Sequence, residues 1–276
     1  SKAIISKKLV TLKKDTPVNR VLEEFILKEI DKDKLHKFLR EMEFNRLLSS
    51  VISAYGESTL EANKIGVKLK EKQHTISKKN YHLITQEKQI NIWIKEAEEA
   101  GELAIDTETS SLDAHQADLV GISLSTKIGK ACYIPIGHKS RGCLKKEIVI
   151  RMLKPLLEDE SVKKIGQNIK FDFIVLYKQG INMSSMEDTM LMSYVLDAGK
   201  NRHNMDTLSE IHLNHKTISF KEIVGTGKKE INFSEVEIDK AMEYAAEDAD
   251  ITYRLYKIFN KNLKLEKLTN IYEIFE

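Results

Sequence analysis

The sequence contains no long hydrophobic run and very little cysteine. Among its 276 residues, no apolar stretch approaches the roughly 20 residues needed to cross a bilayer, and no apolar segment follows a basic start as in a signal peptide. Its two cysteines, Cys132 and Cys143, do not form a C-x-x-C pair, which argues against a disulfide framework or a zinc site. These absences predict a cytoplasmic protein without a membrane partner.

Charge is nearly balanced over the whole chain but unevenly distributed along it. The formal net charge is +2, and 41% hydrophobic with 31% charged residues is typical of a globular protein. Residues 1–80 carry 18 Lys and Arg against 11 Asp and Glu, whereas residues 81–276 carry 26 against 31. The basic first part could contact a polyanion, although a solvated, linker-like surface is the commoner explanation.

The first 80 residues form a small helical region followed by a linker. A short apolar strand is expected at 9–12, followed by two short amphipathic helices, one around Leu22, Phe25 and Ile26 and the other over 35–42. Residues 1–55 are too few to bury much core and are expected to be the end of a larger domain. Apolar periodicity fades over 56–80 while lysines accumulate, which predicts an extended linker.

From Tyr81 onward, predicted strands come first and helices follow. Alternating or continuous apolar residues predict strands at 81–84, 103–109, 119–125, 131–136 and 162–165, the third of them half-buried. Helical spacing predicts helices at 86–100, 145–157, 171–178, 188–196, 206–213 and 237–259, the last started by a capping box of Ser234 and Glu237. This order predicts an α/β fold, a mixed sheet flanked by helices on both faces.

Two acidic residues lie at the end of the second predicted strand. Asp106 and Glu108 follow Leu103-Ala104-Ile105 and are separated by one residue, so strand alternation places both carboxylates on the same side of the sheet. Neighbouring carboxylates repel each other unless a cation lies between them, which favours a divalent-metal site. A D-x-E of this kind also occurs by chance in chains of this length, usually in a solvated turn.

Two further segments supply acids close to apolar stretches. Asp172 follows Gly166-Gln167-Asn168 at the start of a helix, and Tyr244 and Asp248 are four residues apart on one helix face. Each has an ordinary alternative: Asp172 could be a solvated acid favoured by the helix dipole, Tyr244 a core aromatic and Asp248 a surface charge. These alternatives do not explain why all the acids occur together in this order.

With these residues the sequence resembles the tyrosine-bearing branch of the DEDD exonuclease superfamily, whose fold is similar to ribonuclease H. The resemblance is closer to the proofreading domain of bacterial DNA polymerase I. It rests on 106–109 with 111–113, on 154–160, 166–168, 202–206 and 244–250, and it covers essentially all of 81–260. Asn204 departs from the pattern, since an acid is expected there. The resemblance implies an active nuclease because all of its acids are present.

The flanking segments resemble the same family. Lys7–Leu12 and Phe38–Phe44 look like the tail of a 5′ nuclease domain, and Leu263–Glu276 looks like the approach to a polymerase domain. We therefore expect a 5′ nuclease tail at 1–55, a linker at 56–80, a 3′-5′ exonuclease domain at 81–262 and the start of a connection at 263–276. The resemblance implies a role in DNA replication and repair, a polymerase domain in cis and a monomeric protein.

The resemblance also implies roles for the acids and the tyrosine. Asp106 would bridge two divalent ions, Glu108 and Asp248 would complete the site nearer the nucleophile, and Asp172 would hold the other ion through water. Oxygen ligands favour Mg²⁺, with Mn²⁺ as a substitute. Tyr244 would orient the attacking water, because a phenol with a pKa of about 10 is a poor base at neutral pH.

The expected substrate is a single-stranded DNA 3′ end, including the frayed terminus of a primer. By resemblance, Leu112 and Phe220 would pack against the terminal bases, and a further set of residues would line the substrate path or contact sugar and phosphate: Gln167, Asn168, Phe171 and Arg202. Such contacts read no base sequence, as a proofreading enzyme requires. The ordinary alternative for Leu112 and Phe220 is core packing.

Two other functions remain open at this point. A ribonuclease D-like exonuclease would trim RNA with the same fold, although the flanking segments argue against it. A non-catalytic platform for single strands or for the polymerase would not need the acids. A 3′ exonuclease assay on DNA and RNA, with Mg²⁺ and with a chelator, separates these functions.

Overall fold

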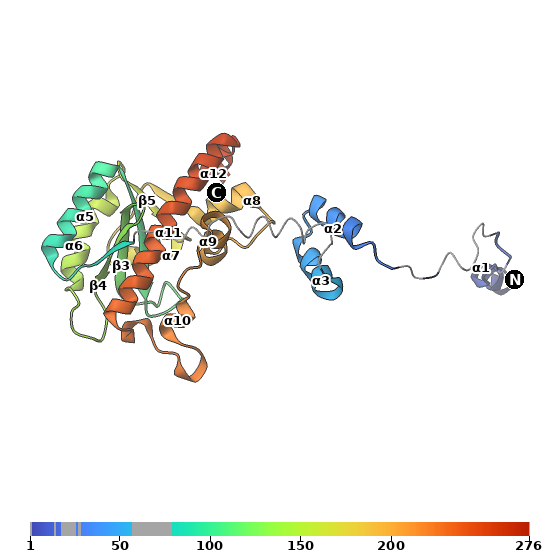
Figure 1. Ribbon diagram of the computed structural model, residues 1–276, viewed down its shortest axis with the longest axis horizontal. Helices are drawn as coiled ribbons and strands as arrows, with labels where there is room; N and C mark the ends of the chain where they lie inside the picture. Colours follow the sequence, from blue (N-terminus) through green and yellow to red (C-terminus); the bar gives the residue numbers. More distant parts are fainter. Residues whose placement is uncertain (1, 14, 18–25, 27–28, 57–78, 276) are drawn as a thin grey trace. The chain divides into compact units, whose positions relative to one another are not determined.

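The computed structural model describes residues 2–13, 15–17, 26, 29–56 and 79–275 (Figure 1). The chain divides into two compact units, Ser1–Glu71 and Lys72–Glu276. Most of the predicted linker lies outside the described residues, as do Leu22 and Phe25 of the first predicted helix.

The described part of the first unit is helical. It contains α1 (Lys2–Val10), α2 (Lys32–Glu41) and α3 (Asn45–Tyr55). The Asp31 carboxylate caps α2 by accepting a hydrogen bond from the Lys34 N–H at 3.1 Å, and α2 contacts α3. The strand predicted at 9–12 is wrong, because Leu9 and Val10 end α1. A short apolar run does not distinguish a strand from a helix, and among the described residues no strand lies alongside to pair with this one.

The second unit is built on a mixed sheet. Its described strands lie in the order β1-β4-β3-β2-β5-β6. The antiparallel pairs are β2–β3 and β3–β4, and the other pairs are parallel. The strand bounds are β1 (Asn80–Leu83), β2 (Glu102–Thr109), β3 (Leu119–Lys127), β4 (Lys130–Pro135), β5 (Lys163–Gly166) and β6 (Met186–Asp188).

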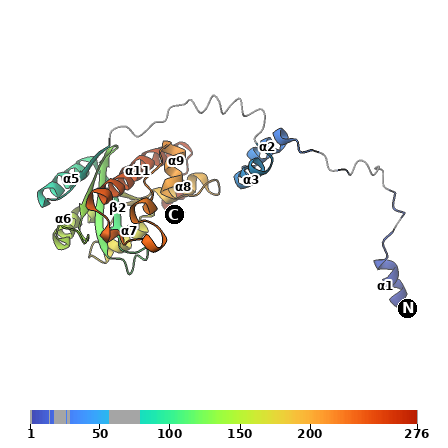
Figure 2. The same ribbon diagram turned by 60° about the horizontal axis from the view of Figure 1, so that its bottom comes forward.

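Helices cover both faces of this sheet, as predicted (Figure 2). One face is covered by α5 (Glu87–Ala100), α6 (Lys146–Glu158) and α7 (Lys170–Tyr177). The long helix α11 (Ile238–Leu265) crosses the other face and contacts α8 (Thr189–Asp197), α9 (Met205–Leu213) and α10 (Phe220–Val224). The last helix, α12 (Thr269–Phe275), contacts α8.

The central strands are buried on both faces, and this corrects one prediction. We expected β3 to be half-buried from its alternation of apolar residues with Gly121, Ser123 and Ser125, but all its residues from Leu119 to Thr126 are buried. Gly121, Ser123 and Ser125 are small enough to fit beneath α11, which contacts β3. Their small size, and not exposure to solvent, therefore explains why they alternate with larger apolar residues along the strand. The bulkier Ile122 and Leu124 pack in the core beneath α5 and α6.

The start of α11 also differs from the prediction. Glu237 is the N-cap residue of the helix and makes no side-chain capping hydrogen bond, so the predicted capping box of Ser234 and Glu237 is wrong. The capping box belongs instead to Asn232 and Glu235, around the short 3₁₀ helix η3 (Phe233–Glu235). Both pairs have the same spacing, and only the tertiary contacts of this segment select one of them.

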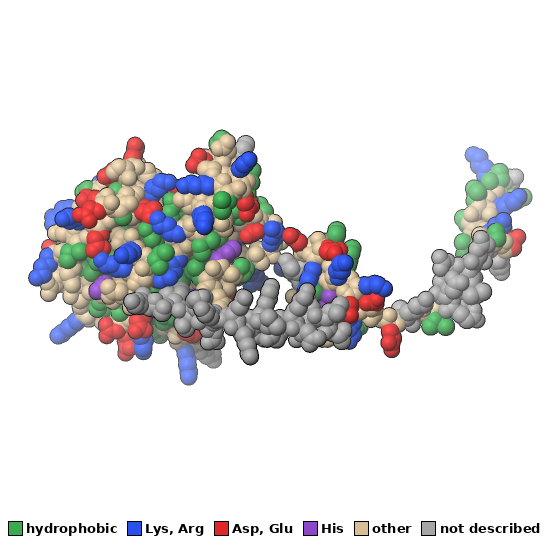
Figure 3. Space-filling view, turned by 45° about the horizontal axis from the view of Figure 1, so that its top comes forward, with side chains coloured by type: hydrophobic (Ala, Val, Ile, Leu, Met, Phe, Trp, Pro, Cys, Tyr) green, Lys and Arg blue, Asp and Glu red, His purple; other side chains and the backbone are tan. Residues whose placement is uncertain are grey.

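The surface of the second unit carries both signs of charge. On the face drawn in Figure 3, Lys and Arg side chains are interspersed with Asp and Glu. Within the described part of the chain, no helix is both long and apolar enough to span a membrane.

Candidate active site

Strand β2 delivers Asp106 and Glu108 to one face of the sheet. Its odd residues Leu103 and Ile105 belong to the core beneath α5 and α6, whereas Ala104 belongs to the core beneath α11. Alternation therefore directs Asp106 and Glu108 toward α11. Near the carboxyl end of β2 the register with β3 shifts, so that Gly121 opposes Glu108, Leu119 opposes Thr109 and one extra residue lies between them. Such bulges are common beside active sites.

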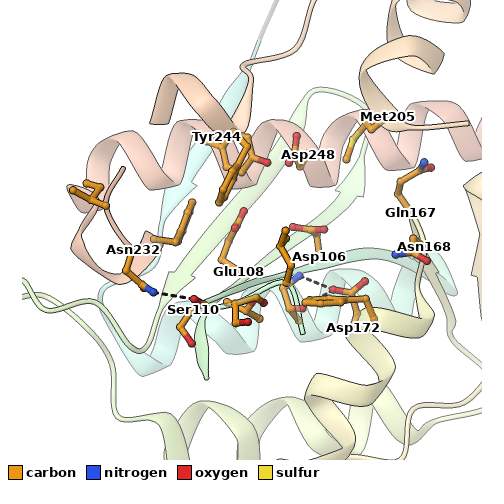
Figure 4. A pocket seen from close by; sticks show the side chains of 18 of the residues that line it. Asp106, Glu108, Ser110, Gln167, Asn168, Asp172, Met205, Asn232, Tyr244 and Asp248 are labelled. Atoms are coloured by element: carbon orange, nitrogen blue, oxygen red, sulfur yellow. Dashed lines mark hydrogen bonds between the residues drawn. The ribbon is translucent and has the colours of Figure 1, made fainter. Parts of the chain in front are cut away.

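Helix α11 supplies Tyr244 and Asp248 from the opposite side. The residues are four positions apart, so they lie one turn apart on the helix face that covers the sheet. Carboxylate oxygens of Asp106, Glu108 and Asp248 lie within 4.8 Å of one another. Figure 4 shows these side chains converging between β2 and α11.

Asp172 lies on α7, on the face of the sheet opposite to α11. It lies in the first turn of α7, and its Oδ1 accepts hydrogen bonds from the Thr107 N–H at 2.9 Å and the Thr107 hydroxyl at 2.5 Å. Thr107 is the residue between Asp106 and Glu108 and points to the α7 side of the sheet. Its contacts fix Asp172 beside the acidic cluster.

The acids border a cavity of about 910 Å³ between β2, α7, α11 and the segment that precedes α11. Every residue of the predicted site except Arg202 lines this cavity. The full set of lining residues is Asp106, Thr107, Glu108, Thr109, Ser110, Ser111, Leu112, Gln167, Asn168, Phe171, Asp172, Met205, Phe220, Gly227, Glu230, Ile231, Asn232, Phe233, Tyr244 and Asp248. A cavity of this size accommodates a nucleotide-sized group.

Burial raises the pKa of every carboxyl group in the cluster, and the charge of neighbouring carboxylates raises three of these pKa values further. Burial raises the pKa of Asp106 to about 6. Burial and the neighbouring carboxylates raise the pKa of Glu108 well above its ordinary value, and burial with the Asp106 charge does the same for Asp172 and Asp248. Hydrogen bonds from Thr107 to Asp172 and from Tyr244 to Asp248 oppose these increases. The cluster therefore favours binding of a positive charge.

The donor set fits a divalent cation. Glu108 Oε1 is buried and has no hydrogen-bond partner among the described residues, although a buried carboxylate oxygen normally has one. Asp106, Glu108 and Asp248 offer hard oxygen ligands at mutual distances that one ion can bridge. These observations support Asp106, Glu108, Asp172 and Asp248 as the residues that would hold metal.

Tyr244 is held by its ring and presents its hydroxyl to the acids. The ring contacts Phe220 edge-on at a centroid distance of 6.1 Å and Phe233 at 6.0 Å, and Phe220 stacks on Phe233 at 6.1 Å. Burial, with the charges of Asp248 and Glu108, raises the pKa of Tyr244 far above that of a free phenol. The hydroxyl therefore keeps its proton and can donate a hydrogen bond.

The residues predicted to contact substrate occupy different environments. Leu112 is 90% exposed and Phe220 40% exposed, and both line the cavity, so Leu112 is not a core residue. The Gln167 amide already donates to His203 O at 2.8 Å and accepts from the Thr189 hydroxyl. Arg202 is exposed and is not among the cavity-lining residues, so its contact remains a prediction.

Several residues of the site were not predicted from the sequence. Thr107 and Met205 line the cavity, as does the segment that carries Asn232 and Phe233. Asn232 Nδ2 donates to Ser110 O at 2.8 Å and joins this segment to the end of β2 (Figure 4). The Thr107 side chain could have been identified from its place inside the D-x-E pattern, whereas the 227–233 segment has no comparable signal.

Comparison with known proteins identifies the family. A model of the 3′-5′ exonuclease family matches residues 81–264, two thirds of the chain and all of the acidic cluster. The chain belongs to this 3′-5′ exonuclease family. Its DNA polymerase I relatives include that of Rhizobium leguminosarum, 46% identical over 205 residues and 67% of this chain, and that of Pseudomonas aeruginosa, 36% identical over 268 residues and 95% of this chain. The matches span 20% and 29% of those relatives.

Solved structures with the same fold are more distant in sequence. The Mg²⁺-bound Brucella melitensis protein NrnC aligns with a TM-score of 0.52 and 24% identity over 70% of this chain and 85% of its own. Escherichia coli RNase D, an exoribonuclease, aligns with a TM-score of 0.56 and 17% identity over 70% of this chain and 48% of its own. Together with the mixed sheet, these neighbours show the ribonuclease H-like α/β fold, as predicted. The family model and the sequence relatives, not these structures, show that the exonuclease domain is of the kind that DNA polymerase I carries.

Proposed function

We propose that this exonuclease hydrolyses single-stranded DNA from its 3′ end with two divalent ions, Mg²⁺ by preference and Mn²⁺ as a substitute, and releases 5′ mononucleotides. The observation that carries the proposal is the convergence of Asp106, Glu108 and Asp248 within 4.8 Å, with the unpartnered Glu108 Oε1 among them. Neighbouring carboxylates repel one another, and cations bound between them would stabilise their charged form.

Each residue then has a defined role. Asp106 would bind both ions, Glu108 and Asp248 would complete the site nearer the nucleophile, and Asp172 would hold the second ion through water. The ions would activate the attacking water and stabilise charge on the attacking and leaving oxygens. Tyr244, which keeps its proton, would orient that water through its hydroxyl.

The shape of the cavity supports a frayed or unpaired strand end as the substrate. Both Leu112 and Phe220 line the cavity and expose apolar surface, Leu112 almost its whole side chain and Phe220 part of its ring. Aromatic and apolar side chains stack on any base, so these contacts suit a proofreading enzyme that must remove any nucleotide. Phe171, Asn168, Gln167 and Arg202 would contact the strand from the α7 side.

We also propose the domain organisation expected from the sequence. Residues 1–55 would be the tail of a 5′ nuclease domain, 56–80 a linker, 81–262 the exonuclease and 263–276 the start of a connection to a polymerase domain in cis. The protein would be a monomer and would act in the cytoplasm, in DNA replication and repair. Brief proteolysis should cut first between residues 56 and 80 and leave an active piece that starts near residue 81; cleavage within 81–262 before that would contradict this organisation.

The test uses 5′-labelled single strands of DNA and RNA of one sequence. With Mg²⁺ we expect a ladder of progressively shorter DNA products, slower digestion of RNA, and none in excess EDTA. Activity that persists in EDTA would refute the metal mechanism. Faster digestion of RNA than of DNA would favour a ribonuclease instead, and strand binding without digestion would indicate a non-catalytic platform.

A further inference from the structure

We infer that the adjacent residues Asp188 and Thr189 position the loop that carries Gln167 and Asn168 and thereby place the acid Asp172; the inference rests on the proposed metal-dependent function. Asp188 ends β6 and Thr189 begins α8. Neither side chain lines the cavity. Asp188 would act on the site through the backbone of residues 166–169, and Thr189 through Gly166 and the Gln167 side chain.

The Asp188 carboxylate is buried against this loop. Its Oδ1 accepts from the Asn168 N–H at 2.9 Å, and its Oδ2 accepts from the Ile169 N–H at 3.0 Å. Oδ1 also accepts from the Met190 N–H at 2.8 Å, as expected for the N-cap of α8. Two of these three donors therefore belong to a loop about twenty residues earlier in the chain, which a residue acting purely as a helix cap would not contact.

The loop needs external support because its backbone is constrained. Asn168 has a φ of 62°, in the left-handed region that few residues other than glycine adopt. At Gly166 an added Cβ would lie 2.7 Å from Ile169 Cγ1, so the chain turns very closely upon itself between β5 and α7. The turn directs the N–H groups of Asn168 and Ile169 to the same carboxylate.

Thr189 holds the side of the loop that faces the cavity. Its hydroxyl lies 3.0 Å from Gly166 O and 2.5 Å from Gln167 Oε1. Gln167 Nε2 donates in turn to His203 O, which connects the loop to the segment that carries Arg202. The two side chains thus fix the backbone and one predicted substrate contact together.

The position of Asp172 follows from this arrangement. Ile169 is the N-cap of α7, and its carbonyl accepts from the Phe173 N–H at 2.8 Å. Asp172 is in the first helical turn, so rotation of the loop changes the direction in which its carboxylate leaves the helix. The Asp188 N–H donates to the Tyr272 hydroxyl of α12 at 2.9 Å, so this helix helps to hold the Asp188 backbone in place.

Asp188→Asn tests the inference. Asparagine is a good N-cap residue and can keep α8 capped, but its single carbonyl oxygen cannot accept from both Asn168 and Ile169 in the native geometry. We expect exchange of the Ile169 amide proton to accelerate about tenfold in the metal-free protein, because its hydrogen bond is lost while the amide oxygen keeps those from Asn168 and Met190. Calorimetry should show Mn²⁺ binding weakened about 10- to 100-fold, the usual effect of removing a group that orients a metal ligand.

Asp159→Asn is the matched control. Asp159 is exposed, and its carboxylate also accepts a backbone N–H, from Ser161 at 2.8 Å, but outside the cavity. This variant should keep wild-type Mn²⁺ affinity. Wild-type amide exchange and Mn²⁺ affinity in Asp188→Asn would overturn the inference. If wild type shows no nuclease activity, the proposed function fails, while exchange and calorimetry still test the positioning.

Thr189→Val keeps the inference testable if Asp188→Asn does not fold. Valine has nearly the same shape and leaves the Asp188 cap in place, but it lacks the hydroxyl near Gly166 and Gln167. We expect the KM for single-stranded DNA to rise about 10-fold while kcat at saturating metal changes little, because Gln167 loses its anchor. An unchanged KM in this variant would overturn the inference.

Discussion

The ring and the hydroxyl of Tyr244 have different roles. Its ring packs against Phe220 and Phe233, and its hydroxyl faces Asp248 with its proton retained. Tyr244→Phe keeps the packing and removes the hydroxyl, so activity should fall about 100-fold, at the low end of typical orienting contributions. Single-turnover digestion of labelled DNA in Mg²⁺ measures this, and DNA binding in EDTA should not change.

Tyr177→Phe is the control for this substitution, because Tyr177 is 61% exposed on α7 and does not line the cavity. It should retain full activity. If Tyr244→Phe is as inactive as Asp106→Ala, the hydroxyl does more than orient water. Full activity would show that it has only a structural role.

At the residue scale, the sequence identifies groups whose geometry is local. Asp106 with Glu108, and Tyr244 with Asp248, share a face because of strand and helix periods, and the structure places each pair accordingly. The contacts of Asp172 with Thr107 and of Asp188 with Asn168 join residues 65 and 20 positions apart. Such contacts depend on the folded arrangement and leave no periodic signal.

At the scale of elements, α11 anchors two other segments through Glu247. This buried carboxylate contacts Lys79 ahead of β1, His215 at 3.0 Å and the Ile218 N–H at 2.6 Å. Burial raises its pKa, but the hydrogen bonds from Lys79, Ile218 and His215 outweigh burial and leave the pKa lowered. A lowered pKa stabilises the fold above the unfolded-state pKa of about 4.3, and this stabilisation is lost as pH falls through the folded-state pKa.

Glu247→Gln should therefore lower the free energy of unfolding by about 2 kcal/mol at pH 7, since hydrogen bonds to a charged group are lost. The difference from wild type should shrink below pH 4.3. Urea denaturation at pH 7 and at a pH below 4.3 measures this difference in the free energy of unfolding. Glu243→Gln, at an exposed position of the same helix, is the control. Equal stability of Glu247→Gln and wild type at pH 7 would contradict the anchoring role.

Elements with a sustained apolar period were predicted well, and the four-residue strands β1 and β5 were predicted to within one residue at each end. The helices α5 and α11 and the strands β2 and β3 follow from their periodicity. The three-residue strand β6 and the five-residue helix α10 are too short to show a period. Both are held by tertiary contacts, and α10 brings Phe220 to the cavity.

At the scale of the whole molecule, the acidic cluster should make the metal-free protein less stable at high pH. The pKa of Asp106 is raised to about 6, and the pKa values of Glu108, Asp172 and Asp248 are raised as well. Folding then favours the protonated acids. This stabilisation is complete below the unfolded-state pKa of about 4 and is lost as pH rises through the folded values.

We expect the Tm of the protein in EDTA to fall between pH 5 and pH 8, and Mg²⁺ or Mn²⁺ to raise the Tm more at pH 8 than at pH 5. Asp106→Asn should flatten this dependence, because its amide does not titrate. Scanning calorimetry measures both proteins. A metal-free wild-type Tm that rises over this range in parallel with Asp106→Asn would contradict the electrostatic account of the cluster.

The most direct test of the proposed mechanism is digestion of 5′-labelled single-stranded DNA in Mg²⁺ by wild type, Asp106→Ala and Asp239→Ala at equal concentration. Asp106 lies in the acidic cluster, whereas Asp239 is an exposed acid at the start of α11. We expect wild type and Asp239→Ala to shorten the strand from its 3′ end at similar rates, and Asp106→Ala to leave it intact. Digestion by folded Asp106→Ala at the wild-type rate would contradict a nuclease built on these carboxylates.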